Sequence, residues 1–83
     1  MMSYDNILSQ VFAILQPFVQ NGQRLGEKTD LVADLGLDSL KVMNLLETME
    51  DRLDLSIPLN VLAEIQTIED LARQLQRLIE ENR

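Results

Sequence analysis

The sequence predicts an all-α protein, a small four-helix bundle with three principal helices and one short helix. Apolar residues recur at helical spacing in three separate stretches, and no stretch alternates as a half-buried strand would. Glycine and proline are sparse, with three and two copies in 83 residues. A chain of this length forms one domain around one modest core, so we treat residues 1–83 as a single domain.

The first helix is expected from about Ser3 to Val19, with Ser3 as its N-cap. Pro17 should weaken the last turn, because proline lacks a backbone N–H and crowds the preceding turn. A continuous apolar stripe should face the core. Its members are Ile7, Leu8, Val11, Phe12, Leu15 and Phe18.

Residues 20–38 should form a long, irregular loop that leads into the second helix. Loops of this length are uncommon in compact domains and are often functional. We expect a short helical turn from Asp30 to Asp34. The loop should pack on the core through its apolar side chains, which are Leu25, Leu31, Val32, Leu35 and Leu37.

The second helix should run from about Ser39 to Leu53. Its core stripe comprises Val42, Leu45, Leu46, Met49 and Leu53. Leu40 and Met43 fall outside that stripe, so they should be at least partly exposed, beside the carboxylates Glu47, Glu50 and Asp51.

The remainder of the chain should form a short helix and a long one. Pro58 precedes the short third helix, Leu59 to Glu64, which we expect to be partly 3₁₀, with Leu59 and Val61 exposed. Thr67 is a suitable N-cap for the last helix. The buried stripe of that helix comprises Ile68, Leu71, Ala72, Leu75, Leu78 and Ile79.

Cysteine and histidine are both absent from the chain. The protein therefore lacks a thiol nucleophile, the two commonest zinc ligands and the usual base near neutral pH. A Ser–His–Asp or Cys–His catalytic arrangement is excluded. Catalysis by carboxylates alone stays open, but such a site needs a pocket, which a helical chain of this length rarely encloses. We expect no catalytic residue, no metal site and no enzymatic activity.

The charge of the chain is strongly negative. Seven Lys and Arg residues face 14 Asp and Glu residues, for a net charge of −7. This balance argues against nucleic acid, whose phosphates require basic residues, and favours partners with basic surfaces. No signal peptide or membrane-spanning run is visible. We expect a cytoplasmic monomer that contacts no membrane. The initial Met and the length suggest a free-standing protein, and an excised domain of a larger protein stays open.

The segment Asp34-Leu35-Gly36-Leu37-Asp38-Ser39-Leu40 ends the long loop and opens the second helix. One interpretation is purely structural, because Asp and Ser are favoured N-caps and glycine is an ordinary turn residue. The other is functional. A serine at a helix N-terminus lies beside free backbone donors and a favourable dipole, which suits a phosphate group.

The sequence DLGLDSL resembles the phosphopantetheine attachment motif of acyl carrier proteins. From Asp34 to about Leu75 the chain follows the order of that family without gaps, including the pair Ile57-Pro58. The resemblance implies that Ser39 carries 4′-phosphopantetheine, transferred from coenzyme A by a phosphopantetheinyl transferase. It implies that cargo is held as a thioester on the arm, and that Asp38 lies near the transferase and its metal.

The resemblance also implies a surface for acyl-loading and acyl-processing enzymes that carry basic docking patches. Leu40 and Met43 match exposed apolar contacts of the family, and Ile57 matches an apolar residue near the exit of the arm and the cargo pocket. Acidic positions that meet Arg and Lys on partners correspond to Glu47, Glu50 and Asp51.

Three departures from the family pattern bear on the pathway. Lys41 and Asn44 stand where fatty-acid synthesis carriers are acidic, and the short helix has one carboxylate where those carriers have several. We therefore expect a carrier of a specialised fatty-acid-like, polyketide or other secondary-metabolite pathway. Two alternatives stay open: a peptidyl or aminoacyl carrier of a nonribosomal pathway, and an acidic helical adaptor that never receives an arm.

Overall fold

The computed structural model describes residues 3–19 and 23–81. Three α-helices dominate it: α1 (Tyr4–Leu15), α2 (Ser39–Leu53) and α3 (Ile68–Glu81). Two 3₁₀ helices join them, η1 (Gln16–Phe18) and η2 (Leu59–Glu64). The predicted fold class of three principal helices and one short helix is confirmed, and η1 is an additional single turn.

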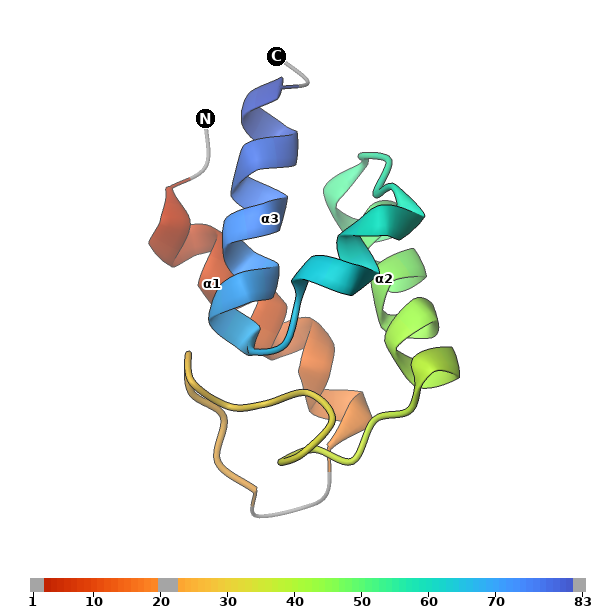
Figure 1. Cartoon of the computed structure of the whole chain (residues 1–83). Helices are drawn as coiled ribbons and strands as arrows, with labels where there is room; N and C mark the ends of the chain where they lie inside the picture. The colour runs from red at the N-terminus through yellow and green to blue at the C-terminus, as the bar shows by residue number, and fades with distance from the viewer. Residues whose placement is uncertain (1–2, 20–22, 82–83) are drawn as a thin grey trace.

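The three long helices enclose one aliphatic core. In Figure 1, α1 and α3 lie against each other, and α2 flanks them with the η2 segment crossing between α2 and α3. The core contains residues from every principal helix and from the loop. Its fully buried members include Ile7, Val11, Leu15, Leu31, Leu37, Leu45, Met49, Ile68, Leu71 and Leu75.

The ends of α1 follow from local sequence. The Ser3 hydroxyl accepts a hydrogen bond from the backbone N–H of Asn6 at 3.2 Å, so Ser3 is the N-cap as predicted. The α-helix ends at Leu15, and Pro17 lies in the 3₁₀ turn that follows. The predicted stripe missed Ile14, which is buried.

The last helix also begins as predicted. The Thr67 hydroxyl accepts from the backbone N–H of Asp70 at 3.1 Å, and the Asp70 carboxylate accepts from the backbone N–H of Thr67 at 3.0 Å. This reciprocal pair satisfies two donors at the start of α3. The pKa of Asp70 is lowered, first by the Thr67 N–H.

Two predictions about apolar loop residues were wrong. Val32 does not pack on the core, because it is 63% exposed at the outer side of the turn that follows Asp30. Val61 was expected to be exposed and is buried. Leu59, two positions earlier, is 69% exposed, as predicted. A 3₁₀ helix has three residues per turn, so positions two apart in η2 face different directions.

Candidate functional site

The loop before α2 is a hydrogen-bonded turn that holds the DLGLDSL segment in place. Backbone N–H groups of Asp34 and Leu35 both donate to the Asp30 carbonyl, at 3.0 and 3.1 Å. Gly36 then adopts a φ of +69°, a left-handed conformation that favours glycine. The Leu37 N–H donates to the Leu31 carbonyl at 3.1 Å, which brings buried Leu37 back to the core. The chain therefore enters α2 in a fixed direction.

Asp38 is the N-cap of α2, and Ser39 is the first helical residue. The Asp38 carboxylate accepts from the backbone N–H of Lys41 at 2.9 Å. Ser39 is exposed, and among the described residues no side-chain hydrogen bond engages its hydroxyl. The backbone N–H groups of Ser39 and Leu40 likewise have no hydrogen-bond partner in the described part of the chain. A phosphate on Ser39 would thus lie beside two free donors at a helix N-terminus.

A pocket of about 400 Å³ opens beside Ser39. Its walls come from four elements: the turn after Asp30, the start of α2, η2, and the connection to α3. The lining residues are Asp30, Leu31, Val32, Ala33, Ser39, Val42, Leu62, Ile65 and Gln66. The exposed hydroxyl and the neighbouring apolar pocket fit a long flexible group attached at Ser39.

The outer face of α2 combines apolar and acidic side chains. Leu40 is 66% exposed, Met43 is half-buried, and Glu47 and Asp51 are exposed. Within residues 3–19 and 23–81, no Lys or Arg forms an ion pair with either carboxylate. We call Leu40, Met43, Glu47 and Asp51 the α2 face. Exposed apolar groups beside unpaired charges are typical of a docking surface.

Two residues expected on that surface make structural contacts. Glu50 is half-buried, and its carboxylate accepts from the backbone N–H of Ile57 at 2.7 Å, which ties the segment after α2 to the helix. Ile57 is only 8% exposed and belongs to the core. It does not line the pocket beside Ser39. Its low exposure assigns Ile57 a place in the core, and its role as a partner contact stays a prediction.

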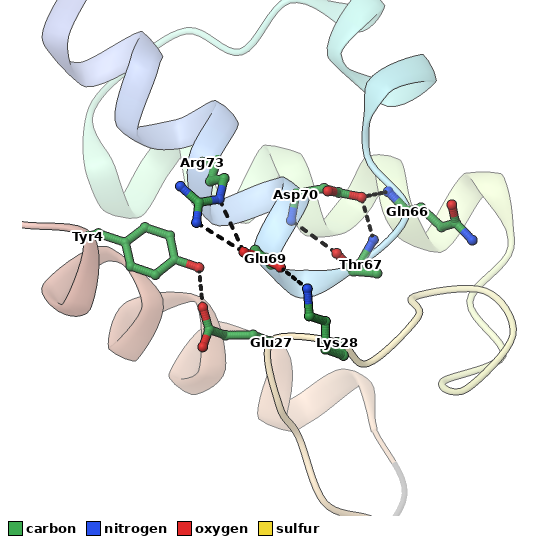
Figure 2. Close-up of polar contacts among 8 residues, drawn as sticks. All are labelled: Tyr4, Glu27, Lys28, Gln66, Thr67, Glu69, Asp70 and Arg73. Atoms are coloured by element: carbon green, nitrogen blue, oxygen red, sulfur yellow. Dashed lines mark hydrogen bonds and ion pairs between the residues drawn. The ribbon is translucent and has the colours of Figure 1, made fainter.

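A polar cluster on the other side of the loop fastens it to α1 and α3 (Figure 2). The Tyr4 hydroxyl donates to Glu27 at 2.7 Å, and the Arg73 guanidinium lies over the Tyr4 ring, 5.0 Å from its centroid. Glu69 pairs with Lys28 at 2.8 Å and with Arg73 at 3.0 Å. Lys28, followed by Arg73, lowers the pKa of Glu69. Burial, together with the hydrogen bond to Glu27, raises the pKa of Tyr4 to about 12.

The contact between two residues of the pocket wall was missed by sequence reasoning. Asp30 and Gln66 lie 36 positions apart, and the Gln66 amide donates to the Asp30 carboxylate at 2.9 Å across the pocket wall. The Leu31 N–H also donates to the Gln66 carbonyl at 2.9 Å. Nothing in the local pattern around either residue predicts this contact.

Comparison with known proteins identifies the family. The phosphopantetheine attachment site family matches residues 8–75, most of the chain. The chain belongs to this family, that of the acyl carrier proteins. A Caulobacter vibrioides protein named probable acyl carrier protein is 44% identical over 45 residues, which are 54% of this chain and 52% of that protein. The mitochondrial acyl carrier protein of Saccharomyces cerevisiae is 31% identical over 72 residues, 81% of this chain and 58% of that protein.

A solved structure supports the same fold. A Mycobacterium tuberculosis protein provisionally named an acyl carrier protein superposes with a TM-score of 0.76 at 27% identity, covering 84% of this chain and 95% of that one. The chain spans a little over half the length of the two curated relatives.

Membership of this family establishes the type of cofactor and the type of protein. The cofactor is covalently attached 4′-phosphopantetheine, and members are carriers, so the prediction that the chain is not an enzyme is confirmed. Within the described residues, no helix is both long and apolar enough to cross a membrane. No group of three or more acidic side chains in those residues is arranged to hold a metal ion.

Proposed function

We propose that the chain is an acyl carrier protein whose 4′-phosphopantetheine arm is attached to Ser39. The observation that carries the proposal is the position of this serine, exposed at the first turn of α2 and beside an apolar pocket, within the matched family region. The arm supplies a terminal thiol, on which an acyl group is held as a thioester. Tethering raises the effective concentration of that group at each partner enzyme.

Attachment is a phosphoryl-type transfer in which Ser39 is the acceptor. Its hydroxyl oxygen forms a new bond to the phosphorus next to the pantetheine of coenzyme A, and the pyrophosphate bond breaks to release adenosine 3′,5′-bisphosphate. The hydroxyl proton must go to a base. Because the chain has no histidine, we assign that base and the metal to the transferase.

The residues around Ser39 present it for this step. The Asp38 side chain caps the helix at the Lys41 N–H, and the Ser39 and Leu40 N–H groups keep no partner among the described residues. Those two donors would stabilise the phosphodiester. We propose that Asp38 also faces the transferase, since its carboxylate is exposed next to the acceptor.

Partner enzymes would dock on the α2 face. The apolar contact comes from Leu40 and Met43, and long-range steering of basic partners comes from Glu47 and Asp51. Glu50 would contribute only through charge, because its carboxylate is engaged with the Ile57 N–H. Truncation of Leu40 should weaken partner affinity without loss of stability, because the side chain is 66% exposed.

Charge on α2 favours a specialised pathway of fatty-acid-like, polyketide or other secondary metabolism. Lys41 is exposed two positions after Ser39, and Asn44 is exposed and neutral. A surface with these residues is less acidic than one built for strongly basic housekeeping enzymes. A peptidyl or aminoacyl carrier would use the same serine, so the loading enzyme discriminates between the two kinds of cargo.

The deciding experiment is the intact mass of the protein after incubation with coenzyme A, Mg²⁺ and a broad-specificity phosphopantetheinyl transferase. The native chain should gain one phosphopantetheine. Ser39→Ala should gain none, and Ser9→Ala, which removes another exposed helical serine, should behave as the native chain does. A folded native protein that gains no mass with several transferases would overturn the proposal and favour an adaptor without an arm.

A further inference from the structure

The pocket beside Ser39 is mostly apolar, with one acidic and no basic residue in its lining. Apolar side chains make most of its wall: Leu31, Val32, Ala33, Val42, Leu62 and Ile65. The remaining lining residues are Ser39, Asp30 and Gln66, and none of the nine is basic. If the proposed function is right, an acyl group carried on the arm meets one fixed negative charge and no positive one in this pocket.

That negative charge is held in place by the fold. The Asp30 carboxylate accepts from the backbone N–H groups of Val32 at 2.9 Å and Ala33 at 2.7 Å, and from the Gln66 amide at 2.9 Å. The Ala33 N–H, followed by the Gln66 amide, lowers the pKa of Asp30. Each bond favours the ionised form, so Asp30 stays charged at neutral pH.

Gln66 is held from the opposite wall. Its backbone N–H donates to Asp70 at 3.0 Å, and its carbonyl accepts from the Leu31 N–H at 2.9 Å. Figure 2 shows its amide side chain directed away from Asp70, which leaves the amide free to reach Asp30. The other carboxylate close to this contact is Asp34, which accepts from the Asp30 N–H at 2.8 Å. The surroundings of the Asp30–Gln66 contact are therefore acidic on both walls.

We infer that Asp30, held by Gln66, makes the pocket selective for neutral acyl groups and excludes acyl groups that end in a free carboxylate. A carboxylate entering an apolar pocket loses hydration and needs a cationic partner, and here it would meet a like charge instead. The arm is tethered only at Ser39, so an excluded group stays in solvent, open to partner enzymes, while a neutral group of similar length is sheltered. Asp30 is thus a specificity-determining residue, and Gln66 is a positioning residue.

The test compares two six-carbon cargoes, the hexanoyl group and the adipoyl group, in which a carboxylate replaces the terminal methyl group. Each is loaded from its coenzyme A thioester and verified by intact mass, and the backbone amide shifts of Leu31, Ala33 and Ile65 are compared with those of the protein carrying the bare arm. Hexanoyl should shift these amides. Adipoyl should shift them at least about tenfold less, as expected for a like charge near an ionised carboxylate.

Two variants assign the effect to the Asp30 charge. In Asp30→Asn the side-chain oxygen still accepts from the Val32 and Ala33 N–H groups, and a flipped Gln66 amide can accept from the new amide. Gln66→Lys instead places an ammonium group beside Asp30. Adipoyl should shift the pocket amides more in both variants than in the native protein, and most in Gln66→Lys, because only that variant supplies a cationic partner for the carboxylate. Glu80→Gln, which removes the same charge from an exposed site on α3, should leave the discrimination as in the native protein.

The outcomes separate this inference from the proposed function. Equal shifts from both cargoes in the native protein, or none from either, would overturn the selectivity and leave the carrier function intact, because the arm is verified independently by mass. Discrimination that persists in both variants would overturn the role of Asp30. A native chain that accepts no arm would overturn the proposed function, and the inference with it.

Discussion

Truncation of Ile57 tests whether this residue belongs to the core or to a docking surface. The side chain is 8% exposed and packs within the core cluster. Ile57→Ala removes three buried carbon groups at about 0.8 kcal/mol each, or about 2.4 kcal/mol of transfer free energy. A residual cavity adds to this loss, so the free energy of unfolding should fall by about 3 kcal/mol. For a domain of this size, the corresponding decrease in Tm is roughly 12–24 °C.

Urea unfolding followed by far-ultraviolet circular dichroism measures this loss directly. Ile57→Val should cost about 0.5–1.5 kcal/mol, since it removes a single methylene group. Leu40→Ala is the matched surface truncation and should change stability by no more than about 0.5 kcal/mol, because Leu40 is 66% exposed.

The opposite pattern would refute the assignment of Ile57 to the core. If Ile57→Ala kept native stability and yet slowed modification by the transferase, its side chain would act as a partner contact. Low exposure would then not identify a core residue in the segment that the Glu50 hydrogen bond ties to α2.

Three further predictions concern the α2 cap, the turn at Gly36 and the half-buried Tyr4. Asp38→Ala should lower the free energy of unfolding by about 1 kcal/mol through loss of the α2 cap, whereas Asp38→Asn should keep the cap. Slower modification of Asp38→Asn by the transferase would reveal a role for the negative charge of Asp38. Gly36→Ala should lower the free energy of unfolding in urea by about 1–2 kcal/mol, because alanine is strained at a φ of +69°. No atom lies near the added methyl group, so this strain and not a clash sets the cost, and an unchanged midpoint would show that the turn relaxes. Tyr4 is the single tyrosine, and its phenolate absorbance should titrate with a midpoint of about 12 in the folded protein and about 10 when unfolded. Because the pKa of Tyr4 is higher in the folded protein, protonated Tyr4 stabilises the fold below pH 10, and this stabilisation is lost as the pH rises toward 12. Glu27→Gln should lower the folded midpoint, and an unchanged midpoint would refute the contribution of Glu27.

The sequence by itself determined the features that depend on neighbours along the chain. Helical periodicity assigned the core faces of α2 and α3, since residues three and four apart share a face whatever the rest of the chain does. Caps at Ser3 and Thr67 follow from side chains that bond to backbone groups three positions away. The DLGLDSL segment belongs to the same class, because a glycine turn, an N-cap and a serine are local features.

Only the tertiary structure decided which side chains meet across long separations. Tyr4 reaches Glu27 over 23 positions, and Asp30 reaches Gln66 over 36, so neither contact leaves a trace in local spacing. The burial of Ile57 and the exposure of Val32 depend on how the loops close over the core. Loop side chains have no helical or strand period that fixes their direction, and their direction is set by hydrogen bonds to distant segments. The position of Ser39 at the helix start is therefore a property of the sequence, while the charged pocket beside it is a property of the fold.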